Sequence, residues 1–122
     1  MTYDPNNVFA KILRGEIPCK NFYEDEFVLA FHDIHPQAPT HILVIPKGSY
    51  TNHEDFVAGA TAEEVAGFYR AVAKVAEIAG VNSTGYRLIS NSGAHAHQEV
   101  PHYHVHILGG RALGKLIEKA GA

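Results

Sequence analysis

Three histidines near the end of the chain, His102, His104 and His106, alternate with apolar and aromatic residues in the stretch HYHVHIL. A β-strand turns every second side chain to the same face, so this spacing predicts that the three imidazoles lie side by side. Adjacent imidazoles suit two kinds of chemistry. They bind a metal ion, or they attack and protonate a substrate near neutral pH.

Two explanations without covalent chemistry are open. In the first, the histidines form a solvated surface by coincidence of composition. In the second, the three imidazoles bind zinc, with Glu99 or His41 as a fourth ligand. Metal-bound imidazoles need acceptors for their other nitrogen, and carboxylates are few near these histidines. We therefore expect neither a metal ion nor another cofactor.

Covalent catalysis on phosphorus is the interpretation that we favour. A neutral imidazole nitrogen attacks a phosphoryl centre and forms a phosphohistidine, which divides one difficult displacement into two easier ones. Flanking imidazoles on the same face contact the phosphate oxygens or protonate the leaving group. His104 has a histidine on each side, so it is the best candidate for the nucleophile.

The elements before the triad predict how it is positioned. Asp4 is expected to be the N-cap of a helix that has Pro5 in its first turn and stops at Gly15. A hairpin follows, with its turn at residues 24–26, and HILVIP predicts a buried strand over 41–46.

The second half of the chain predicts one long helix and two strands. Thr61 and Glu64 have the spacing of a capping box, and apolar residues then recur at helical spacing over 61–79. Strands are expected over 85–91 and 103–110, with a short helical tail over 112–120. Strand runs broken by one long helix indicate an α+β domain built on a mostly antiparallel sheet.

Composition narrows the class of protein. The 122 residues suit one domain, 1–122, and a net charge of −3 gives no support for a nucleic-acid partner. There is no long apolar run, so we expect no membrane partner. The single cysteine, Cys19, forms no intramolecular disulfide, and the expected location is the cytoplasm.

The chain resembles the histidine triad family in three blocks. HYHVHIL matches its pattern His-φ-His-φ-His-φ-φ, where φ is apolar or aromatic, and FHDIHPQAPTHILVIPK (31–47) resembles its second diagnostic block. NVFAKILRGEIPCKNFYED (7–25) resembles the Hint, or protein-kinase-C-interacting-protein-like, branch. The resemblance implies a HIT-like fold, a five-stranded antiparallel sheet with a long central helix and a short N-terminal helix. It also implies a homodimer, with Tyr69, Val72, Val75 and Ile78 either at the interface or covering the sheet.

The resemblance implies a role for each catalytic residue. His104 would be the nucleophile that becomes adenylylated, His102 would orient it, and His106 would contact the phosphate and assist the leaving group. His41 matches a fourth histidine beside the triad, and Asp33 matches an acid that binds the ribose hydroxyls. The other implied nucleotide-binding residues are Phe9, His32, Ile34 and Leu43 in a purine slot, and Asn91, Gln98 and Glu99 at the phosphate.

The chain departs from the family pattern at several positions. Glu99 stands where animal Hint proteins often have serine or threonine, and His97 replaces a usual glycine. Asn7 and Ala10 stand where some members have two zinc-binding cysteines, so we expect no structural zinc. The tail after Gly110 also differs from that of the animal branch.

These features together predict a metal-independent hydrolase of purine nucleoside monophosphate conjugates, such as phosphoramidates, with a nucleotidyl-His104 intermediate. Three alternatives are open: a dinucleoside polyphosphate hydrolase, a nucleotide-binding dimeric scaffold with little turnover, and a metal-dependent enzyme.

Overall fold

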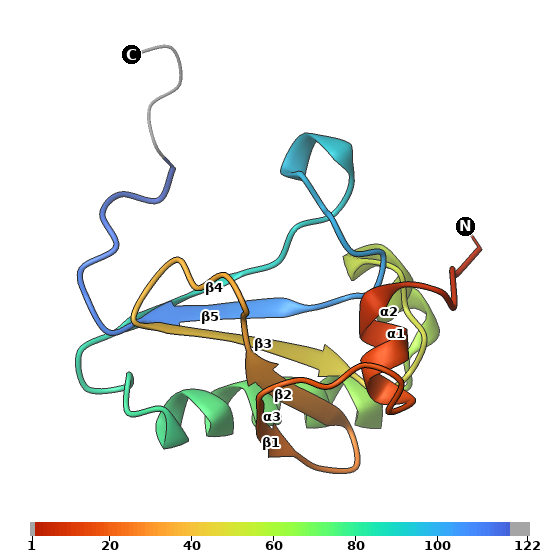
Figure 1. Ribbon diagram of the computed structural model, residues 1–122, viewed down its shortest axis with the longest axis horizontal. Helices are drawn as coiled ribbons and strands as arrows, with labels where there is room; N and C mark the ends of the chain where they lie inside the picture. Colours follow the sequence, from red (N-terminus) through yellow and green to blue (C-terminus); the bar gives the residue numbers. More distant parts are fainter. Residues whose placement is uncertain (1, 118–122) are drawn as a thin grey trace.

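The computed structural model describes residues 2–117, whose strands form a five-stranded antiparallel sheet (Figure 1). The strands are β1 (Asn21–Glu24), β2 (Val28–His32), β3 (Thr40–Pro46), β4 (Tyr86–Ile89) and β5 (Val105–Gly109). Their order across the sheet is β1-β2-β3-β5-β4. The predicted α+β class, with its five-stranded antiparallel sheet, is therefore confirmed.

The long helix α3 (Ala62–Ile78) covers one face of the sheet, along the lower side of Figure 1. It begins as predicted. The Oγ1 of Thr61 accepts a hydrogen bond from the backbone N–H of Glu64, and a carboxylate oxygen of Glu64 accepts one from the N–H of Thr61, both at 3.1 Å. Its buried side chains are Phe68, Ala71, Val72, Val75 and Ala76.

These helix residues pack on alternate residues of the central strands. Val28, Ala30, Ile42, Val44, Val105 and Ile107 form the sheet side of this core. Because Val72 and Val75 are buried in it, they cover the sheet, whereas Tyr69 and Ile78 are 40% and 51% exposed.

The opposite face of the sheet carries a smaller cluster. The short helix α1 (Val8–Leu13) lies over one end of this face and inserts Phe9 among Leu29, Phe31, Leu43 and Ile45. Only Phe9 and Ala10 of the helix are buried. α1 therefore covers only part of this face, and the histidines lie on the part that it leaves uncovered.

The predicted start of α1 is wrong by three residues. Asn7, not Asp4, is the N-cap, because its Oδ1 accepts a hydrogen bond from the N–H of Ala10 at 2.9 Å. Asp4 and Pro5 form a turn before the helix, in which Oδ1 of Asp4 accepts a hydrogen bond from the N–H of Asn6 at 2.9 Å. Asparagine and aspartate cap helices about equally well, so the sequence did not distinguish these positions.

Other boundaries also differ from the prediction. The last strand begins at Val105 rather than at residue 103, and α2 (His53–Gly59) was not predicted. A short 3-10 helix, η1 (Ala94–Ala96), forms in the loop before the triad. Residues 112–117 of the expected helical tail are not helical, and the remainder of that tail lies outside the described residues. Within residues 2–117, no helix combines the length and apolar character needed to span a bilayer.

Replacing Thr61 with alanine should destabilise the domain by about 1 kcal/mol, because the substitution leaves the first turn of α3 without its side-chain acceptor. Urea unfolding of Thr61→Ala and the parent measures this difference. Ser83→Ala, in the exposed turn after α3, is the matched control and should change the free energy of unfolding by less than about 0.5 kcal/mol. Equal stability of Thr61→Ala and the parent would show that the cap contributes nothing.

Candidate active site

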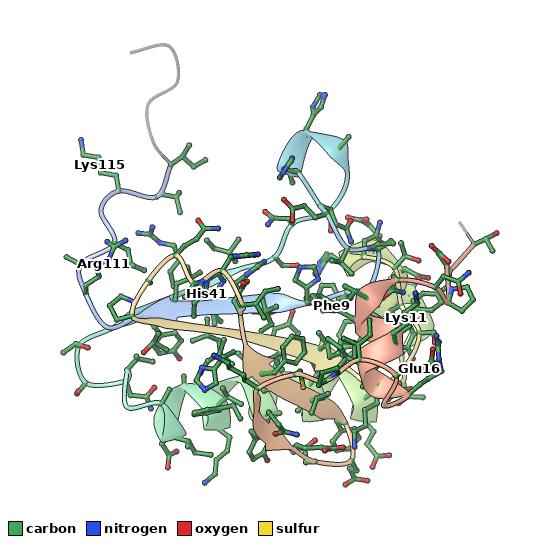
Figure 2. The ribbon with its side chains drawn as sticks, in the orientation of Figure 1. Phe9, Lys11, Glu16, His41, Arg111 and Lys115 are labelled. Atoms are coloured by element: carbon green, nitrogen blue, oxygen red, sulfur yellow. The ribbon has the colours of Figure 1, made fainter. Side chains whose placement is uncertain are left out.

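Pairing of β3 with β5 brings together two histidines far apart in the sequence. Leu43 is opposite His106 in the antiparallel register, and His41 is opposite Leu108, so the imidazoles of His41 and His106 lie on the same face. Their ring nitrogens, Nε2 of His41 and Nδ1 of His106, are 2.9 Å apart. Figure 2 shows His41 and Phe9 on the side of the sheet away from α3.

His102 and His104 precede β5, in an irregular segment that bends at Pro101 and His102. Tyr103 between them is buried in the α3 core. The Nε2 of His102 lies 2.9 Å from the carbonyl oxygen of Pro46, at the end of β3. The Nδ1 of His104 lies 2.7 Å from the carbonyl oxygen of His102 itself. Phe9 contacts the ring of His104 edge-on at 5.0 Å between centroids.

These partners determine which nitrogen of each neutral imidazole carries its hydrogen, because a carbonyl oxygen only accepts and a backbone N–H only donates. His102 donates Nε2–H to Pro46, and His104 donates Nδ1–H to the carbonyl of His102. The Nε2 of His104 therefore keeps a free lone pair. This is the atom that a nucleophilic imidazole needs.

The same reasoning applies to the other two rings. The N–H of Gln37 donates to Nδ1 of His41 at 3.0 Å, so His41 carries its hydrogen on Nε2 and donates it to Nδ1 of His106. Neutral His106 then carries its own hydrogen on Nε2. Beside a lone pair on His104, the site thus holds a donor on His106, whose ring centroid is 5.1 Å away.

Burial lowers the pKa of all four rings and so favours their neutral forms near pH 7. His102 is fully buried, and desolvation lowers its pKa to about 4; the hydrogen bond to Pro46 opposes this shift, and the neighbouring His104 adds to it. Burial, aided by His104 and His41, also lowers the pKa of His106 to about 4. Desolvation lowers the pKa of His41 and of His104 as well, although the Asp33 carboxylate opposes it in both cases.

Three of the predicted nucleotide-binding side chains lie beside this cluster. Phe9 and Leu43 belong to the apolar cluster on this face, with Phe9 against His104 and Leu43 opposite His106. The Oδ2 of Asp33 is 3.4 Å from Nε2 of His41, and its Oδ1 accepts a hydrogen bond from the N–H of His35 at 2.8 Å. The Asp33 side chain is 19% exposed, so it is only partly covered by its neighbours.

The other two predicted members of the purine slot, His32 and Ile34, are not part of the apolar cluster of Phe9 and Leu43. His32 pairs with Ile42, a residue of the α3 core, so its side chain starts on the other face of the sheet and contacts Phe22 edge-on. Ile34 is 76% exposed in the loop after β2.

The side chain of Gln98 holds the loop before the triad together through three hydrogen bonds to backbone groups. Its side-chain amide donates to the carbonyls of Thr51 at 2.8 Å and Val100 at 3.1 Å, and its Oε1 accepts from the N–H of Gly93 at 3.0 Å. Gln98 was predicted to bind phosphate, but here its polar atoms are engaged within the protein.

His97, which the resemblance places where glycine is expected, adopts φ 57°. The loop therefore has a left-handed conformation at a residue other than glycine, which costs about 1–2 kcal/mol. The Nε2 of His97 is 2.9 Å from Glu99, whose side chain is 75% exposed. Among the described residues, no hydrogen bond joins Glu99 or the half-buried Asn91 to the histidine cluster of the site.

Sequence reasoning missed three groups that hold the imidazoles: the carbonyl of Pro46, the N–H of Gln37 and the hydroxyl of Tyr3, which lies 2.6 Å from Nδ1 of His102. The first two are backbone atoms, which carry no signal in residue type. Tyr3 is 99 positions from His102 and belongs to no motif.

Asp33, His41 and His106 are the described residues that come closest to a metal-binding set, with one ligand atom from each within 4.8 Å of the others. A cation there would have to replace the hydrogen bond between His41 and His106, because that bond uses the nitrogens that face each other.

The histidine cluster on an antiparallel sheet defines the class of this protein. The sequence pattern of the HIT domain matches residues 14–113, so the chain belongs to the HIT family. It is 64% identical over 118 residues to an uncharacterised 13.2 kDa HIT-like protein of Azospirillum brasilense, covering 97% of both chains.

Two further relatives carry functional names. A purine nucleoside phosphoramidase of Escherichia coli K12 is 45% identical over 114 residues, covering 93% of this chain and 95% of the relative. The crystal structure of a HIT family hydrolase of Legionella pneumophila is 43% identical, with a TM-score of 0.83 over 89% of this chain and 96% of the other.

We expect the free energy of unfolding to rise as the pH increases from about 4 to 6.5. In that range the unfolded chain protonates His102 and His106, whereas the folded protein, in which both pKa values are about 4, does not. Each group contributes a slope of at most about 1.4 kcal/mol per pH unit. Urea unfolding measured across this range for the parent and His106→Gln tests the prediction. The variant should show a shallower slope, and identical slopes would contradict it.

Proposed function

We propose that the protein hydrolyses purine nucleoside monophosphate conjugates, phosphoramidates above all, through a covalent nucleotidyl-His104 intermediate. One observation carries this proposal. The hydrogen bond from Nδ1–H of His104 to the carbonyl of His102 leaves Nε2 as a free lone pair beside the Nε2–H donor of His106. The relative named as a purine nucleoside phosphoramidase supports the choice of substrate.

The reaction has two displacements at phosphorus. In the first, Nε2 of His104 attacks, the bond from phosphorus to the leaving nitrogen breaks, and that nitrogen departs as an amine with a proton taken from solvent water, while Nε2–H of His106 donates a hydrogen bond to the reacting phosphate. In the second, water attacks phosphorus, the bond to Nε2 of His104 breaks, and the proton that the water loses returns to the solvent. Nucleoside monophosphate and a free amine are the products, and neither step requires a metal ion.

The surroundings of the cluster suit a nucleotide. Phe9 and Leu43, which are 7% and 5% exposed, form the apolar side of the cluster against which a purine would pack, and the Asp33 carboxylate would accept hydrogen bonds from ribose hydroxyls. The loop of Gln98 and Glu99 would lie on the leaving-group side, with backbone N–H groups as the phosphate ligands, because the Gln98 side chain is engaged elsewhere. The single Cys19 is consistent with action in the cytoplasm.

Replacing His104 with alanine should lower the rate of adenosine 5′-phosphoramidate hydrolysis by at least about 10³-fold, because the substitution removes the attacking nitrogen. Acid-free quenching followed by mass spectrometry should find a nucleotidyl adduct on His104 in the parent and none in the variant. His35→Ala, which removes an exposed imidazole near Asp33, is the control and should retain activity.

The alternatives predict different outcomes of the same assay. Faster cleavage of diadenosine polyphosphate than of the phosphoramidate would indicate a dinucleoside polyphosphate hydrolase. Tight nucleotide binding without turnover or adduct would indicate a scaffold. Loss of activity with a chelator would favour the metal-dependent alternative, for which Asp33, His41 and His106 supply the ligands.

We further propose a homodimer joined along β4 and α3. β4 is an edge strand of the sheet, and Leu88 pairs with Ile107, so its side chain is on the α3 face. Leu88 is 46% exposed and Ile78 is 51% exposed. An edge strand with exposed apolar side chains is a favourable surface for self-association.

Replacing Leu88 with lysine should shift the protein toward monomer, since it places a charge in this proposed contact. Sedimentation velocity of the parent and Leu88→Lys measures the change. Val57→Lys, which substitutes an apolar side chain that is 56% exposed on α2, is the control and should sediment as the parent does. A monomeric parent would exclude the homodimer.

A further inference from the structure

We propose that Tyr3 is a positioning residue for the nucleophile and acts through His102; this inference rests on the proposed function. The hydroxyl of Tyr3 is 2.6 Å from Nδ1 of His102, and the two rings meet edge-on at 5.7 Å between centroids. Tyr3 lies five residues before α1, outside every motif of the catalytic strand and loop.

The direction of this hydrogen bond follows from the other partner of His102. Because Nε2 of His102 donates to the carbonyl of Pro46, the Nδ1 of the neutral ring has only a lone pair to offer. Tyr3 O–H is therefore the donor. His102 is fully buried, so without Tyr3 its Nδ1 would be an unpaired polar atom inside the protein.

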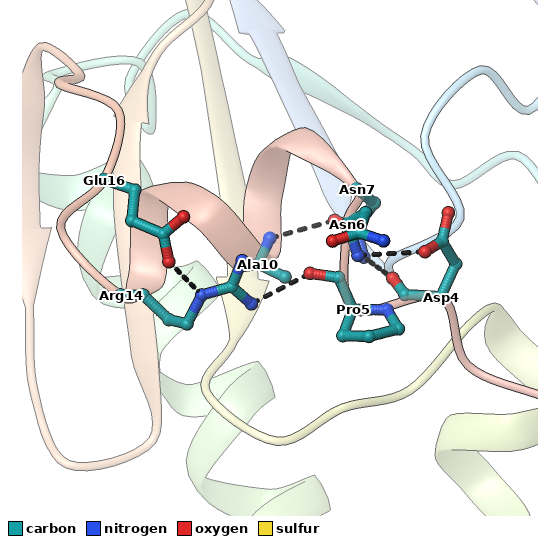
Figure 3. A network of polar contacts seen from close by, with 7 residues as sticks. All are labelled: Asp4, Pro5, Asn6, Asn7, Ala10, Arg14 and Glu16. Carbon is teal, nitrogen blue, oxygen red and sulfur yellow. Dashed lines mark hydrogen bonds and ion pairs between the residues drawn. The ribbon is translucent and has the colours of Figure 1, made fainter.

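The segment that carries Tyr3 is held against α1 by a network of polar contacts (Figure 3). The carbonyl of Asp4 accepts a hydrogen bond from Nδ2 of Asn7 at 2.7 Å, and the carbonyl of Pro5 accepts one from Arg14 at 2.8 Å. Arg14 is also paired with Glu16. Both ends of α1 thus fix the backbone directly after Tyr3, which limits where its ring can lie.

His102 transmits this constraint to the nucleophile. Its ring is held at two points, Tyr3 on one nitrogen and Pro46 on the other, and its carbonyl accepts the Nδ1–H of His104. If the Tyr3 contact is lost, the ring can pivot about the Pro46 bond, and the carbonyl that orients His104 is less firmly placed. Tyr3 is not part of the apolar cluster of Phe9 and Leu43, so substrate binding should be little affected.

Tyr3→Phe tests this inference, because it removes the hydroxyl and keeps the ring. We expect kcat for adenosine 5′-phosphoramidate to fall about five- to tenfold, with KM within about twofold of the parent. In nitrogen-15 spectra, the Nδ1 resonance of His102 should move, and the Nε2 resonance of His104 should shift toward its protonated position.

Tyr23→Phe is the matched control. It removes a hydroxyl that donates to Asp25 at 3.0 Å in the β1–β2 hairpin, and kcat and both histidine resonances should stay at the parent values. Thermal unfolding of both variants establishes that they are folded. An unchanged kcat in Tyr3→Phe, equal losses in both variants, or unmoved His102 and His104 resonances would each overturn the inference.

Failure of the proposed function gives a different result. If the parent forms no nucleotidyl adduct, the proposed reaction is wrong, while the nitrogen-15 spectra of Tyr3→Phe still decide whether Tyr3 sets the state of His104.

Discussion

The hydrogen bond from His104 to the carbonyl of His102 is the interaction on which the site depends. It commits the hydrogen of the ring to Nδ1 and leaves Nε2 free, because the backbone holds the carbonyl of His102 beside Nδ1. A carbonyl oxygen is a suitable partner because it never donates, so it cannot accommodate the other tautomer. An imidazole alone would divide its hydrogen between the two nitrogens.

Burying four neutral imidazoles has an energetic cost that the surrounding contacts offset. Each unpaired ring nitrogen in this interior would cost about 1–3 kcal/mol. The protein supplies partners from four separate places: the carbonyl of Pro46, the N–H of Gln37, the carbonyl of His102 and the hydroxyl of Tyr3. The network thus fixes the tautomers with three backbone groups, in β3, in the loop before β3 and in the segment before β5, and with one side-chain hydroxyl.

Much of the fold follows from local sequence signals. The capping box at Thr61 and the helical periodicity after it specify α3, and the nearly continuous apolar run in HILVIP specifies β3 as a buried strand. α1 was harder, because Asp4 and Asn7 are both good caps and the local sequence does not select between them. α2 was missed because its seven residues bury only Phe56, too few for a periodic pattern.

Local sequence also predicted only part of the site. The triad histidines could be identified from residue type alone, because they recur at strand spacing. Their pairing with His41 depends on the register of β3 against β5, which the triad spacing does not contain. Pro46 acts through a backbone carbonyl, which every residue type offers, and Gln37 acts through a backbone N–H, which every type except proline offers, so no motif marks them.

In the loop from Gly93 to Val100, the residue that holds the backbone differs from the residues that form its exposed surface. His97 takes the left-handed conformation that glycine adopts without strain, and the amide of Gln98 closes the loop from inside. Since Gln98 maintains the path of the chain, position 97 is free to carry an imidazole, and that imidazole pairs with Glu99. The chemistry at the edge of the loop is therefore set by His97 and Glu99 together, while the position of the loop relative to the nucleophile is set by Gln98 and Thr51.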